Sequence, residues 1–461
     1  MAVWSAVKVS GLTSDFRLDP EYYRPDLLEI DRALHRVHAR PLGEFAGAFV
    51  VGPFGSDFNV ENYVEDSPYR YVRGKDVKPF FLQEDDNAYM PKADFERLAK
   101  YTLRPYDLLI SVVGTLGNCA VVPATIGPAV FSCKSTVWRP ADGSEEFALY
   151  LTAYLNCEVG QALIQRLPRG HVQTGLNLDD LRSIPVVEPK TDIVKRVAKL
   201  VQEAQSHVAA AKSKLIKAEE LLVENLDLSH VNLSPQKCYS RRFSDLDAGN
   251  RFGAEYYMPC KKRVLDALRS LPHNTIAFHA PAVRDLWDPE RVPQMMVRNF
   301  DVTHALDPLL DDRQIPEPAA SIGSTKKLFQ SGDVVISRLR SYLKEIAVVR
   351  TSKTVPAVGS SEFIVLRPTG DGLSPETLMV FLRCPHVQTI LKWSQDGSNH
   401  PRFSEADLLA IPVPDAVLSV QDSVDAEVQE ANECRRQASR LLERAKHAVE
   451  EVITSGARNR S

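Results

Sequence analysis

The stretch Asp107–Ser111, which reads DLLIS, recurs further along the chain as DVVIS at Asp333–Ser337. In both copies an acidic residue precedes three consecutive apolar residues and a serine. Short apolar runs between polar residues are typical of buried strands. If the chain is a repeat of one long module, other segments should recur on either side at the same spacing.

Six further pairs of segments do match, in the same order. Asp180-Leu181 and Asp407-Leu408 lie 227 residues apart (407 − 180), and the other offsets differ from this by only a few residues. Seven ordered matches predict two copies of one module, with drift in loops that tolerate insertion. The remaining pairs are Arg17–Tyr23 with Arg251–Tyr257, Val72-Arg73 with Val297-Arg298, Ala120–Val122 with Ala347–Val349, Arg139-Pro140 with Arg367-Pro368, and Gln202–Ala204 with Gln429–Ala431.

Each half contains the same order of expected elements. A region of short buried strands is followed by a shorter helix, a loop, an Ile-Pro-Val strand and a long helix. We therefore expect an α+β fold, with two repeated mixed α/β domains separated and followed by long helices. The expected strands are 108–113, 120–123, 334–337, 346–349 and 363–366, and the shorter helices are Phe147–Leu167 and Ser374–Trp393.

Two long helices, Thr191–Leu226 and Ser419–Thr454, contain no proline or glycine. Apolar residues in the first follow heptad spacing with one stutter, and those in the second form a similar but more polar stripe. One alternative is that each helix packs on its own domain. Two equivalent helices after two equivalent domains instead favour an antiparallel coiled coil that spaces the domains, each helix roughly 54 Å long. The expected packing residues are Leu200, Val208, Leu215, Leu222, Val428, Leu442 and Val449.

These elements give the expected domain boundaries. Residues 1–188 form the first mixed domain and 189–228 the first long helix. Residues 229–414 form the second mixed domain and 415–455 the second long helix, followed by a disordered tail at 456–461.

Composition narrows the class of protein. A chain of 461 residues is too long for one ordinary domain, and 44% hydrophobic with 25% charged residues is typical of a globular protein. The net charge of -4 gives no global sign of nucleic-acid binding. A local basic face would be hidden by that average.

The seven cysteines are scattered and never spaced as in a zinc ribbon or finger. Their odd number and wide spacing argue against a disulfide framework and favour a reducing cytoplasm. We expect no signal peptide, because the first residues hold no long apolar run, and no transmembrane helix, because no stretch of ~20 apolar residues occurs.

Four motifs, taken in order and repeated with the helices, resemble the specificity subunit of type I restriction–modification systems. The resemblance extends over about Phe16–Val452. It implies a non-catalytic subunit with two target recognition domains, each reading one half of a bipartite, gapped DNA site. The motifs are Gly52–Ser56, Tyr71–Val77, Asp107–Ser111 with Gly114, Thr115 and Gly117, and Gly170–Gln173 running into Leu176-Asn177 and Asp180-Leu181.

The resemblance also implies partners. Modification subunits, which use S-adenosylmethionine, would dock on the helices, and a motor-nuclease restriction subunit would join them. We expect no cofactor on this chain; S-adenosylmethionine, ATP and magnesium would be held by the partner subunits.

The second half departs from the family pattern at two loops. Its expected counterpart of Gly52–Ser56 is Ala280–Arg284, which lacks glycine, and its late loop reads GSNHPR at Gly397–Arg402. Divergence at these loops is what two different half-sites require.

Candidate DNA contacts gather in the loops between the expected strands. Arginine and lysine contact phosphates, arginine also recognises guanine edges, and glutamine or asparagine recognises adenine edges. Glycines such as Gly114, Gly117 and Gly170 allow the backbone to approach a phosphate. The candidates are Arg73, Lys75, Lys78, Arg166, Arg169, His171, Gln173 and Asn177 in the first half, and Arg298, Arg338, Arg340, Lys344, Ser398, Asn399, His400 and Arg402 in the second.

Structural roles for these residues remain open alternatives. Basic residues in surface loops are often merely solvated. Arg73 and Arg298 are nearly as well explained as internal partners of Asp76 and Asp301, respectively.

Catalytic motifs are missing from the sequence. There is no Asn/Asp-Pro-Pro-aromatic loop, no Gly-Lys-Ser/Thr phosphate loop and no fixed partner for His171 or His400. Asp85, Asp86 and Lys92 have a spacing that is common in ordinary loops. The competing hypotheses are a self-sufficient DNA-modifying or DNA-cleaving enzyme, and a coiled-coil scaffold without a DNA role.

Overall fold

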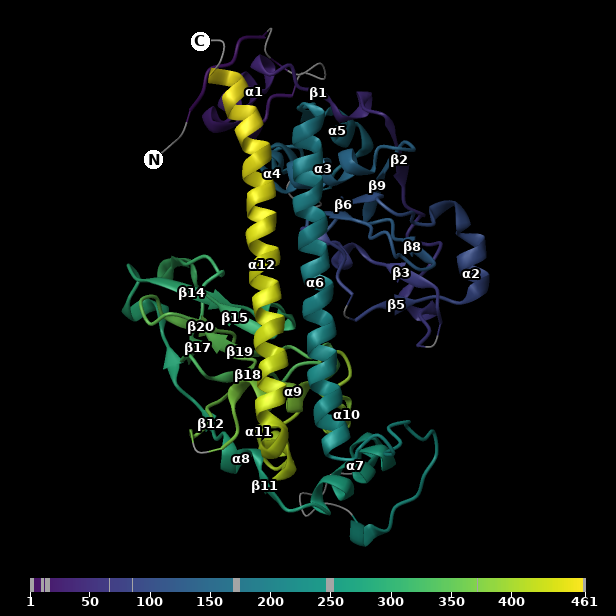
Figure 1. Ribbon diagram of the computed structural model, residues 1–461, viewed down its shortest axis with the longest axis vertical. Helices are drawn as coiled ribbons and strands as arrows, with labels where there is room; N and C mark the ends of the chain where they lie inside the picture. The colour runs from purple at the N-terminus through teal and green to yellow at the C-terminus, as the bar shows by residue number, and fades with distance from the viewer. Residues whose placement is uncertain are drawn as a thin grey trace. The chain divides into compact units, whose positions relative to one another are not determined.

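The computed structural model describes residues 4–9, 12, 17–65, 67–84, 86–168, 175–245, 253–370 and 372–458. The chain forms two compact units (Figure 1). Unit 1 consists of Met1–Val208 and Arg436–Ser461, and unit 2 consists of the intervening Ala209–Arg435. Unit 2 is therefore inserted in the chain between two segments of unit 1.

Unit 1 contains ten strands and five α-helices in its described residues before the first long helix. The strands are β1 (Arg40–Pro41), β2 (Gly47–Val51), β3 (Arg70–Val72), β4 (Phe80–Phe81), β5 (Ala88–Tyr89), β6 (Leu108–Ser111), β7 (Cys119–Val121), β8 (Ala129–Phe131), β9 (Ser135–Pro140) and β10 (Pro185–Val186). The helices are α1 (Pro25–Arg36), α2 (Lys92–Arg97), α3 (Glu145–Asn156), α4 (Glu158–Gln165) and α5 (Leu178–Ser183). The strands form sheets in the orders β2-β9-β6-β7-β4, β5-β3-β8 and β1-β10.

Strand β6 lies at the centre of the five-stranded sheet and is buried on both faces. Leu108 and Ile110 belong to a core that includes Tyr150 and Tyr154 of α3. Leu109 belongs to a separate core that includes Phe131 of the three-stranded sheet. Because side chains alternate along a strand, one apolar run fills both cores.

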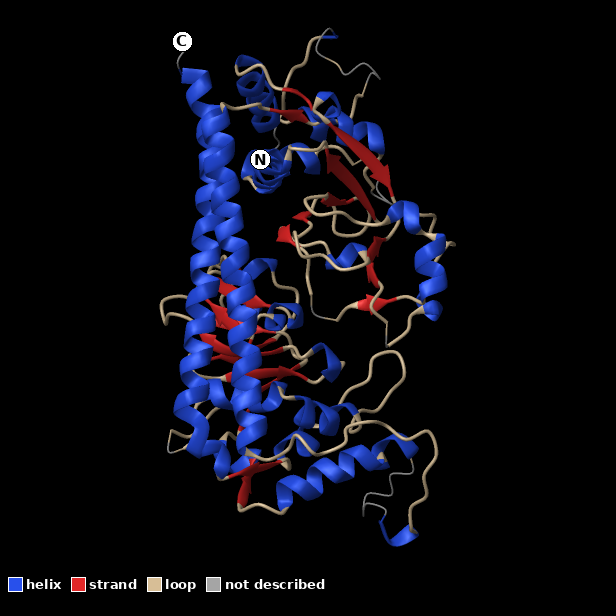
Figure 2. Cartoon of the chain, turned by 45° about the vertical axis from the view of Figure 1, so that its right-hand side comes forward, coloured by secondary structure: helices blue, strands red, loops and turns tan. Residues whose placement is uncertain are grey.

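Unit 2 repeats this plan. Its strands are β11 (His273–Thr275), β12 (Ala282–Val283), β13 (Leu286–Trp287), β14 (Met296–Phe300), β15 (Leu309–Asp311), β16 (Glu317–Pro318), β17 (Lys326–Phe329), β18 (Val334–Ser337), β19 (Ile346–Arg350), β20 (Ala357–Gly359), β21 (Phe363–Leu366) and β22 (Pro412–Pro414). Its helices are α7 (Pro259–Arg269), α8 (Ile276–His279), α9 (Pro375–Arg383), α10 (Pro385–Lys392) and α11 (Glu405–Leu409). Figure 2 shows these helices and strands by colour.

The strand orders confirm the repeat and the expected fold class. The sheet β12-β21-β18-β19-β15 has the same order as β2-β9-β6-β7-β4, and in both the last strand runs parallel to its neighbour. The second sheet of unit 2, β13-β17-β20-β14-β16, contains the counterparts of β8, β3 and β5 and adds β13 and β17. The two units are mixed α/β domains with one topology.

A buried ion pair recurs at the same place in both units. Asp107 accepts hydrogen bonds from Arg139 at 2.8 and 2.7 Å, and Asp333 accepts them from Arg367 at 2.7 and 2.9 Å. Both aspartates also cap the preceding turn, accepting from a backbone N–H three residues earlier at 2.8 and 2.7 Å. These four residues belong to the matched sequence segments, so their recurrence has a structural cause.

The two shorter helices predicted from the sequence are each divided in two, which corrects that prediction. The first breaks between α3 and α4 at Cys157, and the second between α9 and α10 at Cys384. Both cysteines are extended in the backbone and cap the second helix of the pair. Pro385, which lacks an N–H, enforces the second break; the Cys157 thiol accepts a hydrogen bond from Gly160 N–H in the first.

The long helices are α6 (Thr191–Asn225) and α12 (Ala416–Arg458), shown side by side in Figure 1. In unit 1, Val197, Leu200 and Ala204 of α6 share a core with Ala445 and Val449 of α12. In unit 2, the later residues of α6, such as Leu222, share a core with the earlier residues of α12, such as Val428. The pairing within each unit is therefore antiparallel.

Ion pairs in unit 2 follow the same direction. Lys217 pairs with Glu427, and Lys214 pairs with Glu430 at 2.5 Å. A step of three residues back along α6 thus corresponds to three residues forward along α12. Lys214 also lies 3.0 Å from Glu427, and these carboxylates raise the pKa of its ammonium.

Val208 is a correction to the expected packing residues, because its side chain is 42% exposed. The stutter after Ala204 turns Val208 out of the stripe, and Ala211 re-enters it seven residues after Ala204, almost fully buried. Of the other expected residues, Leu200, Leu222, Val428 and Val449 are buried, while Leu215 and Leu442 are half-buried against the two cores.

Helix α12 begins earlier and ends later than expected. It has 43 residues, so the predicted tail overlaps its last turn at 456–458.

In the part of the chain that the structure describes, no helix combines the length and apolarity needed to cross a membrane.

Candidate nucleic-acid interface

Sheet topology brings four loops of unit 1 to one edge of the five-stranded sheet. β2 and β6 end there, while β4, β7 and β9 begin there, as the pairs Val51–Thr136 and Ser111–Ser135 require. We call this surface loop edge 1. It consists of residues 52–57, 73–79, 112–118 and 132–134.

Two glycines let these loops approach each other closely. A side chain on Gly52 would meet the Ser132 carbonyl oxygen at 2.5 Å, and one on Gly74 would meet Lys134 Cβ at 2.8 Å. Between them, Phe54 stands 80% exposed. Loop edge 1 therefore combines packed backbone with an exposed aromatic ring, beside the exposed Lys134.

The loop between β6 and β7 turns on Gly114 and Gly117, whose φ angles of 88° and 82° suit glycine. Val112 N–H donates to the Lys134 carbonyl at 2.9 Å. Val113 forms an antiparallel bridge with Gly175, which follows the late loop in sequence. Gly114 and its neighbour Thr115 are exposed. This is the exposed glycine backbone that the sequence predicts for a phosphate contact.

The predicted DNA contacts of unit 1 fall into three groups. Lys75 and Lys78 are exposed on loop edge 1, although Lys75 pairs with Asp86 at 2.7 Å. Arg73 is only 17% exposed and donates to Asp76 at 3.0 and 3.1 Å, so the structural alternative holds for it. Arg169, His171 and Gln173, together with Gly170, lie outside the described residues.

Arg166 is held within unit 1 by an ion pair, whereas Asn177 is exposed and caps a helix. The Arg166 guanidinium is 7% exposed, donates to Asp31 at 2.9 and 2.8 Å and lies over the Tyr22 ring. Asn177 caps α5, accepting from Asp180 N–H at 2.8 Å. These bonds give both residues a structural role within unit 1.

Unit 2 has the equivalent surface, which we call loop edge 2. It consists of residues 284–285, 301–308, 338–345 and 360–362, with the late loop 396–402 bridged to it through Leu339 and Arg402. At loop edge 2 the structure brings together predicted residues from two loops that are far apart along the chain. They are Arg338, Arg340, Lys344, Asn399, His400 and Arg402.

Glu362 is the centre of the basic cluster. Arg402 donates to it with two nitrogens, at 2.7 and 3.0 Å, and Arg338 Nε lies 3.8 Å from its carboxylate. The Arg402 guanidinium, helped by Arg338, holds the pKa of Glu362 below its ordinary value. Because the carboxylate is fixed between them, it orients two planar donor groups at the surface.

Arg340 and Lys344 occupy positions where unit 1 has glycine. Arg340 has a φ of 49° and Lys344 a φ of 52°, and they correspond to Gly114 and Gly117. A left-handed conformation costs about 1 kcal/mol or more for a residue with a side chain. Arg340 also donates to His400 Nδ1 at 3.1 Å, joining the two loops.

The other predicted residues of unit 2 divide between surface and interior. Ser398, Asn399 and His400 are exposed. Arg298 is 11% exposed and pairs with Asp312 at 3.2 Å. Its role is therefore internal, as one alternative held, but its partner is Asp312 and the expected pair with Asp301 is wrong.

The pairing register also corrects the expected counterpart of Gly52–Ser56. Val283 pairs with Val365 as Val50 pairs with Val137, so Ala280–Arg284 corresponds to the strand β2 itself. The chain that follows β12 leads into β13, which has no counterpart among the described residues of unit 1.

Sequence reasoning missed Lys134, Glu362 and Tyr342. Lys134 and Glu362 occupy equivalent positions, since their carbonyls accept from Val112 and Arg338 at 2.9 and 3.0 Å. Each lies just before a strand, and strand order alone would have placed them on the loop edges. Tyr342, in the same loop as Arg340, is 51% exposed.

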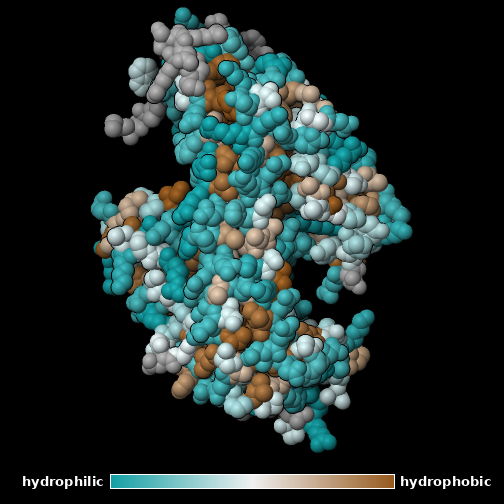
Figure 3. Space-filling model, in the orientation of Figure 1, coloured by the Kyte–Doolittle hydropathy of each residue, from teal (hydrophilic) through white to brown (hydrophobic). Residues whose placement is uncertain are grey.

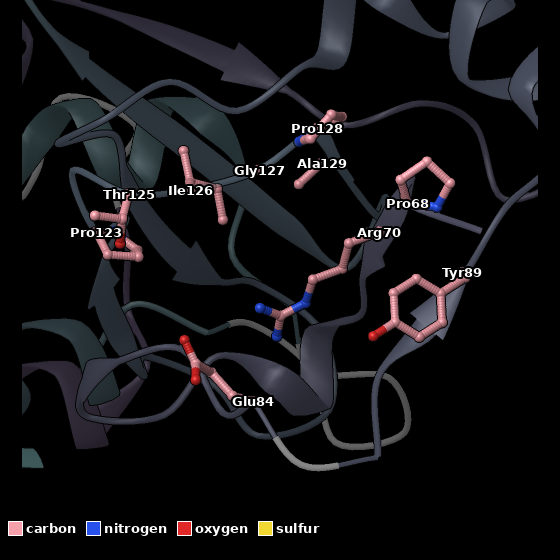
Figure 4. Close-up of a pocket in the computed structure, with 10 residues that line it drawn as sticks. All are labelled: Pro68, Arg70, Glu84, Tyr89, Pro123, Thr125, Ile126, Gly127, Pro128 and Ala129. Carbon is pink, nitrogen blue, oxygen red and sulfur yellow. The ribbon is translucent and has the colours of Figure 1, made fainter. Parts of the chain in front are cut away.

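A pocket of about 210 Å³ lies at the opposite end of β3 from Arg73 (Figure 4). Arg70 extends into it between Tyr89 and the loop 123–128, and donates to the Gln83 carbonyl. Burial lowers the pKa of this guanidinium. The pocket is separate from loop edge 1.

The described residues hold no group of three or more histidine, cysteine or acidic side chains that fits a metal ion. Burial raises the pKa of the Cys157 thiol to about 11 and that of Cys384 to about 12. Both cysteines stand at the N-cap of a helix and are buried, whereas a nucleophilic cysteine needs an accessible thiolate. Figure 3 shows a largely hydrophilic face with apolar side chains in small groups.

No family model matches the sequence, and no curated protein matches it. Among solved structures, the chain is similar to a type I restriction–modification S subunit from M. genitalium, at 13% identity and a TM-score of 0.40 over 90% of this chain and 95% of that one. It is also similar to the HsdS subunit from Thermoanaerobacter tengcongensis, at 13% identity and a TM-score of 0.27 over 90% and 95%. A component of a type I R-M complex matches at 14% identity and 0.27, over 88% and 97%. Likenesses this distant do not decide the function of the present chain.

Proposed function

We propose that this chain is the DNA sequence-recognition subunit of a type I restriction–modification complex, and that each unit reads one half of a bipartite, gapped site. The observation that carries the proposal is the repeat itself. Two domains of one topology present equivalent loop edges whose residues differ. A scaffold has no need of this difference, whereas a reader of two different half-sites does.

The chemistry of the two edges suits different modes of contact. Loop edge 2 presents Arg338, Arg340 and Arg402 with fixed orientation, and arginine recognises guanine edges with two donors. Loop edge 1 presents the backbone of Gly114 and an exposed Phe54, with Lys75, Lys78 and Lys134 for phosphates. Base contacts set the sequence, and phosphate contacts set the position.

The helix pair supplies the spacing in this proposal. Antiparallel α6 and α12 would hold the unread gap, and their outer faces would receive the modification subunits. S-adenosylmethionine, ATP and magnesium belong to the partner subunits, including the restriction subunit, in a bacterial cytoplasm or an equivalent compartment. The chain itself would carry out no reaction.

Methylome sequencing of cells with and without this gene, together with its modification subunit genes, tests the proposal. We expect one asymmetric, gapped motif to lose methylation when this chain is removed. A footprint of the purified complex on that motif should protect both halves. An unchanged set of methylated motifs in cells whose modification subunits are active would overturn the proposal.

The two competing hypotheses make opposite predictions. Incubating the chain alone with DNA, magnesium and S-adenosylmethionine should yield neither cleavage nor methyl transfer, and either product would favour an enzyme. A scaffold without a DNA role should show no salt-dependent binding, whereas phosphate contacts give affinity that falls steeply with salt.

A further inference from the structure

A pocket of about 190 Å³ opens beside loop edge 2, between its central loop and helix α10. Tyr342 and Lys344 contribute one wall, and Gln388, Thr389 and Lys392 of α10 contribute the other. Lys392 is exposed and Lys344 is half-buried, so two lysines line one small hollow. Lys392 Nζ lies 5.3 Å from the centroid of the Trp393 ring. None of the α10 residues was expected from the sequence to contact DNA.

The equivalent place in unit 1 lacks these cations. Cys157 and Cys384 cap α4 and α10 and set the correspondence between the two helices. Thr389 and Lys392 then correspond to Ala162 and Gln165. The residue at the N-terminus of α4 is Glu158, where α10 has a proline.

Packing explains why unit 1 has no counterpart of Lys344. Its equivalent is Gly117, and a side chain there would meet Ile164 Cγ2 at 2.7 Å. Gln161 fills the space as well, donating to the Gly117 carbonyl at 2.9 Å and to the Leu155 carbonyl at 2.7 Å. In unit 1, Ile164 and Gln161 therefore occupy the space that corresponds to the pocket of unit 2.

Gln388, the counterpart of Gln161, forms a side-chain hydrogen bond through its Nε2 but not through its Oε1 among the described residues. Its Nε2 donates to the Leu382 carbonyl at 2.6 Å, and it is 7% exposed. Its Oε1 has no hydrogen-bond partner among the described residues. A buried, unpartnered acceptor on a residue that lines a pocket is a place where an ordered water would bind, since water has two donors and can bridge to an anion.

The geometry points to this pocket as a site for one backbone phosphate of DNA, beside the half-site read by unit 2 and without an equivalent in unit 1. This inference rests on the proposed function. Lys344 and Lys392 would bind the phosphate oxygens, the Tyr342 hydroxyl would donate to them, and Gln388 would hold the bridging water. Lys344 Nζ lies 3.7 Å from Glu219, and the two side chains are 35% and 23% exposed. This distance is too long for a hydrogen bond, so the ammonium would keep its donors for the phosphate.

The test compares the full chain with the double variant Lys344→Gln, Lys392→Gln on duplex DNA over a series of salt concentrations. Each phosphate contact contributes a slope of about 0.9 to the plot of log affinity against log salt. Because the pocket would hold one phosphate, the double variant should lose about one such increment and bind several-fold more weakly at low salt. Lys353→Gln is the matched control, because Lys353 is exposed beyond the opposite end of β19.

The outcomes separate the two proposals. If the unaltered chain, alone and with its modification subunits, shows no salt-dependent binding to duplex DNA, the proposed function fails. If it binds but the double variant has the same slope as Lys353→Gln, the pocket inference is wrong. Stabilisation of the unaltered chain by inorganic phosphate, with an unchanged DNA slope, would assign the pocket to a free anion instead.

Discussion

At the scale of residues, the recurring ion pairs Asp107–Arg139 and Asp333–Arg367 anchor the central strand of each unit. Both aspartates are almost fully buried, and each accepts from two nitrogens of its arginine and from a backbone N–H. A buried ion pair contributes little net free energy to folding. Removing one member is costly, because it leaves the other charge without its partner.

Asp333→Ala should lower the free energy of unfolding of unit 2 by about 1–3 kcal/mol, because Gln330 N–H and Arg367 lose an acceptor while Arg367 keeps its pair with Asp285. The measurement is urea denaturation followed by far-UV circular dichroism. Asp26→Ala is the control, since its pair with Arg24 is exposed on both sides and is worth no more than about 1 kcal/mol. Equal losses in the two variants would contradict the assigned role of the buried pair.

In the proposed complex, Glu362 would position Arg402 and Arg338 at loop edge 2. Glu362→Gln should relax base discrimination in the second half-site by about 1–3 kcal/mol, because Arg402 and Arg338 lose the carboxylate that orients them. Competition between cognate duplex and single-mismatch duplexes measures this. A purely structural role would instead weaken all duplexes equally.

The matched control for that measurement is Glu376→Gln. Glu376 holds Arg350 at 2.6 Å, as Glu362 holds Arg402, but at the opposite end of the sheet. It should lower stability and leave discrimination unchanged. Discrimination lost equally in both variants would show that Glu362 has no special place at loop edge 2.

Two buried histidines make unit 2 sensitive to acid. Burial lowers the pKa of His386 and of His279, so the folded state favours their neutral forms. As the pH falls below about 6.5, the unfolded chain binds these protons first and stability declines until the lower folded pKa is passed. The melting temperature should drop between pH 7.5 and 6.

His386→Gln should flatten this pH dependence while keeping an N–H donor for the Leu228 carbonyl, which His386 contacts at 2.9 Å. Melting curves at both pH values measure the difference, and exposed His35→Gln is the control. A pH dependence identical to that of the unaltered chain would exclude His386 as its source.

At the scale of elements, the central strands were predictable, and the helix break at Cys157 was not. The runs at 334–337 and 363–366 coincide with β18 and β21, because strands buried on both faces read as continuous apolar segments. Nothing in the apolar pattern of Phe147–Leu167 marks the break at Cys157, since the pattern continues on both sides of it. Local backbone bonding decided that element.

The candidate site was predictable only in part, for a related reason. Basic loop residues could be found in the sequence, and Arg338, Arg340 and Arg402 do meet at one surface. The sequence does not show which arginines form ion pairs with carboxylates elsewhere in the chain. Arg166 is claimed by Asp31, 135 residues away, and Arg298 by Asp312.

In the helix pair, the heptad pattern wrongly predicted that Val208 is a packing residue. Leu222→Lys should lower the free energy of unfolding by at least about 3 kcal/mol, because it buries an unpaired charge at a fully buried position. Val208→Lys should change it by no more than about 0.5 kcal/mol, since that side chain is already exposed. Chemical denaturation measures both, and similar losses would mean that Val208 packs after all.

At the scale of the whole molecule, the length of the helix pair should set the number of unread base pairs if the proposed function is right. Deleting 205–211 from α6 and 433–439 from α12 removes one heptad from each helix and preserves the seven-residue spacing of the seam. The rods shorten by about 10.5 Å, so the unread gap in the target should shrink by ~3 base pairs. Methylome sequencing of cells carrying this variant would show the new gap.

Deleting 205–211 alone is the control, because it shifts the two helices out of register and should abolish recognition. An unchanged gap in the double deletion, with methylation intact, would rule out the spacer role.

The insertion of unit 2 between two segments of unit 1 has a consequence for how the chain is made. A ribosome completes Ala209–Arg435, with all the helix halves of unit 2, before it releases the second segment of unit 1. Until then Val197, Leu200 and Ala204 lack the α12 residues that cover them. The domain that is synthesised first is thus the last to close, and its apolar stripe waits uncovered through the translation of more than two hundred codons, the period in which nascent chains most need a chaperone.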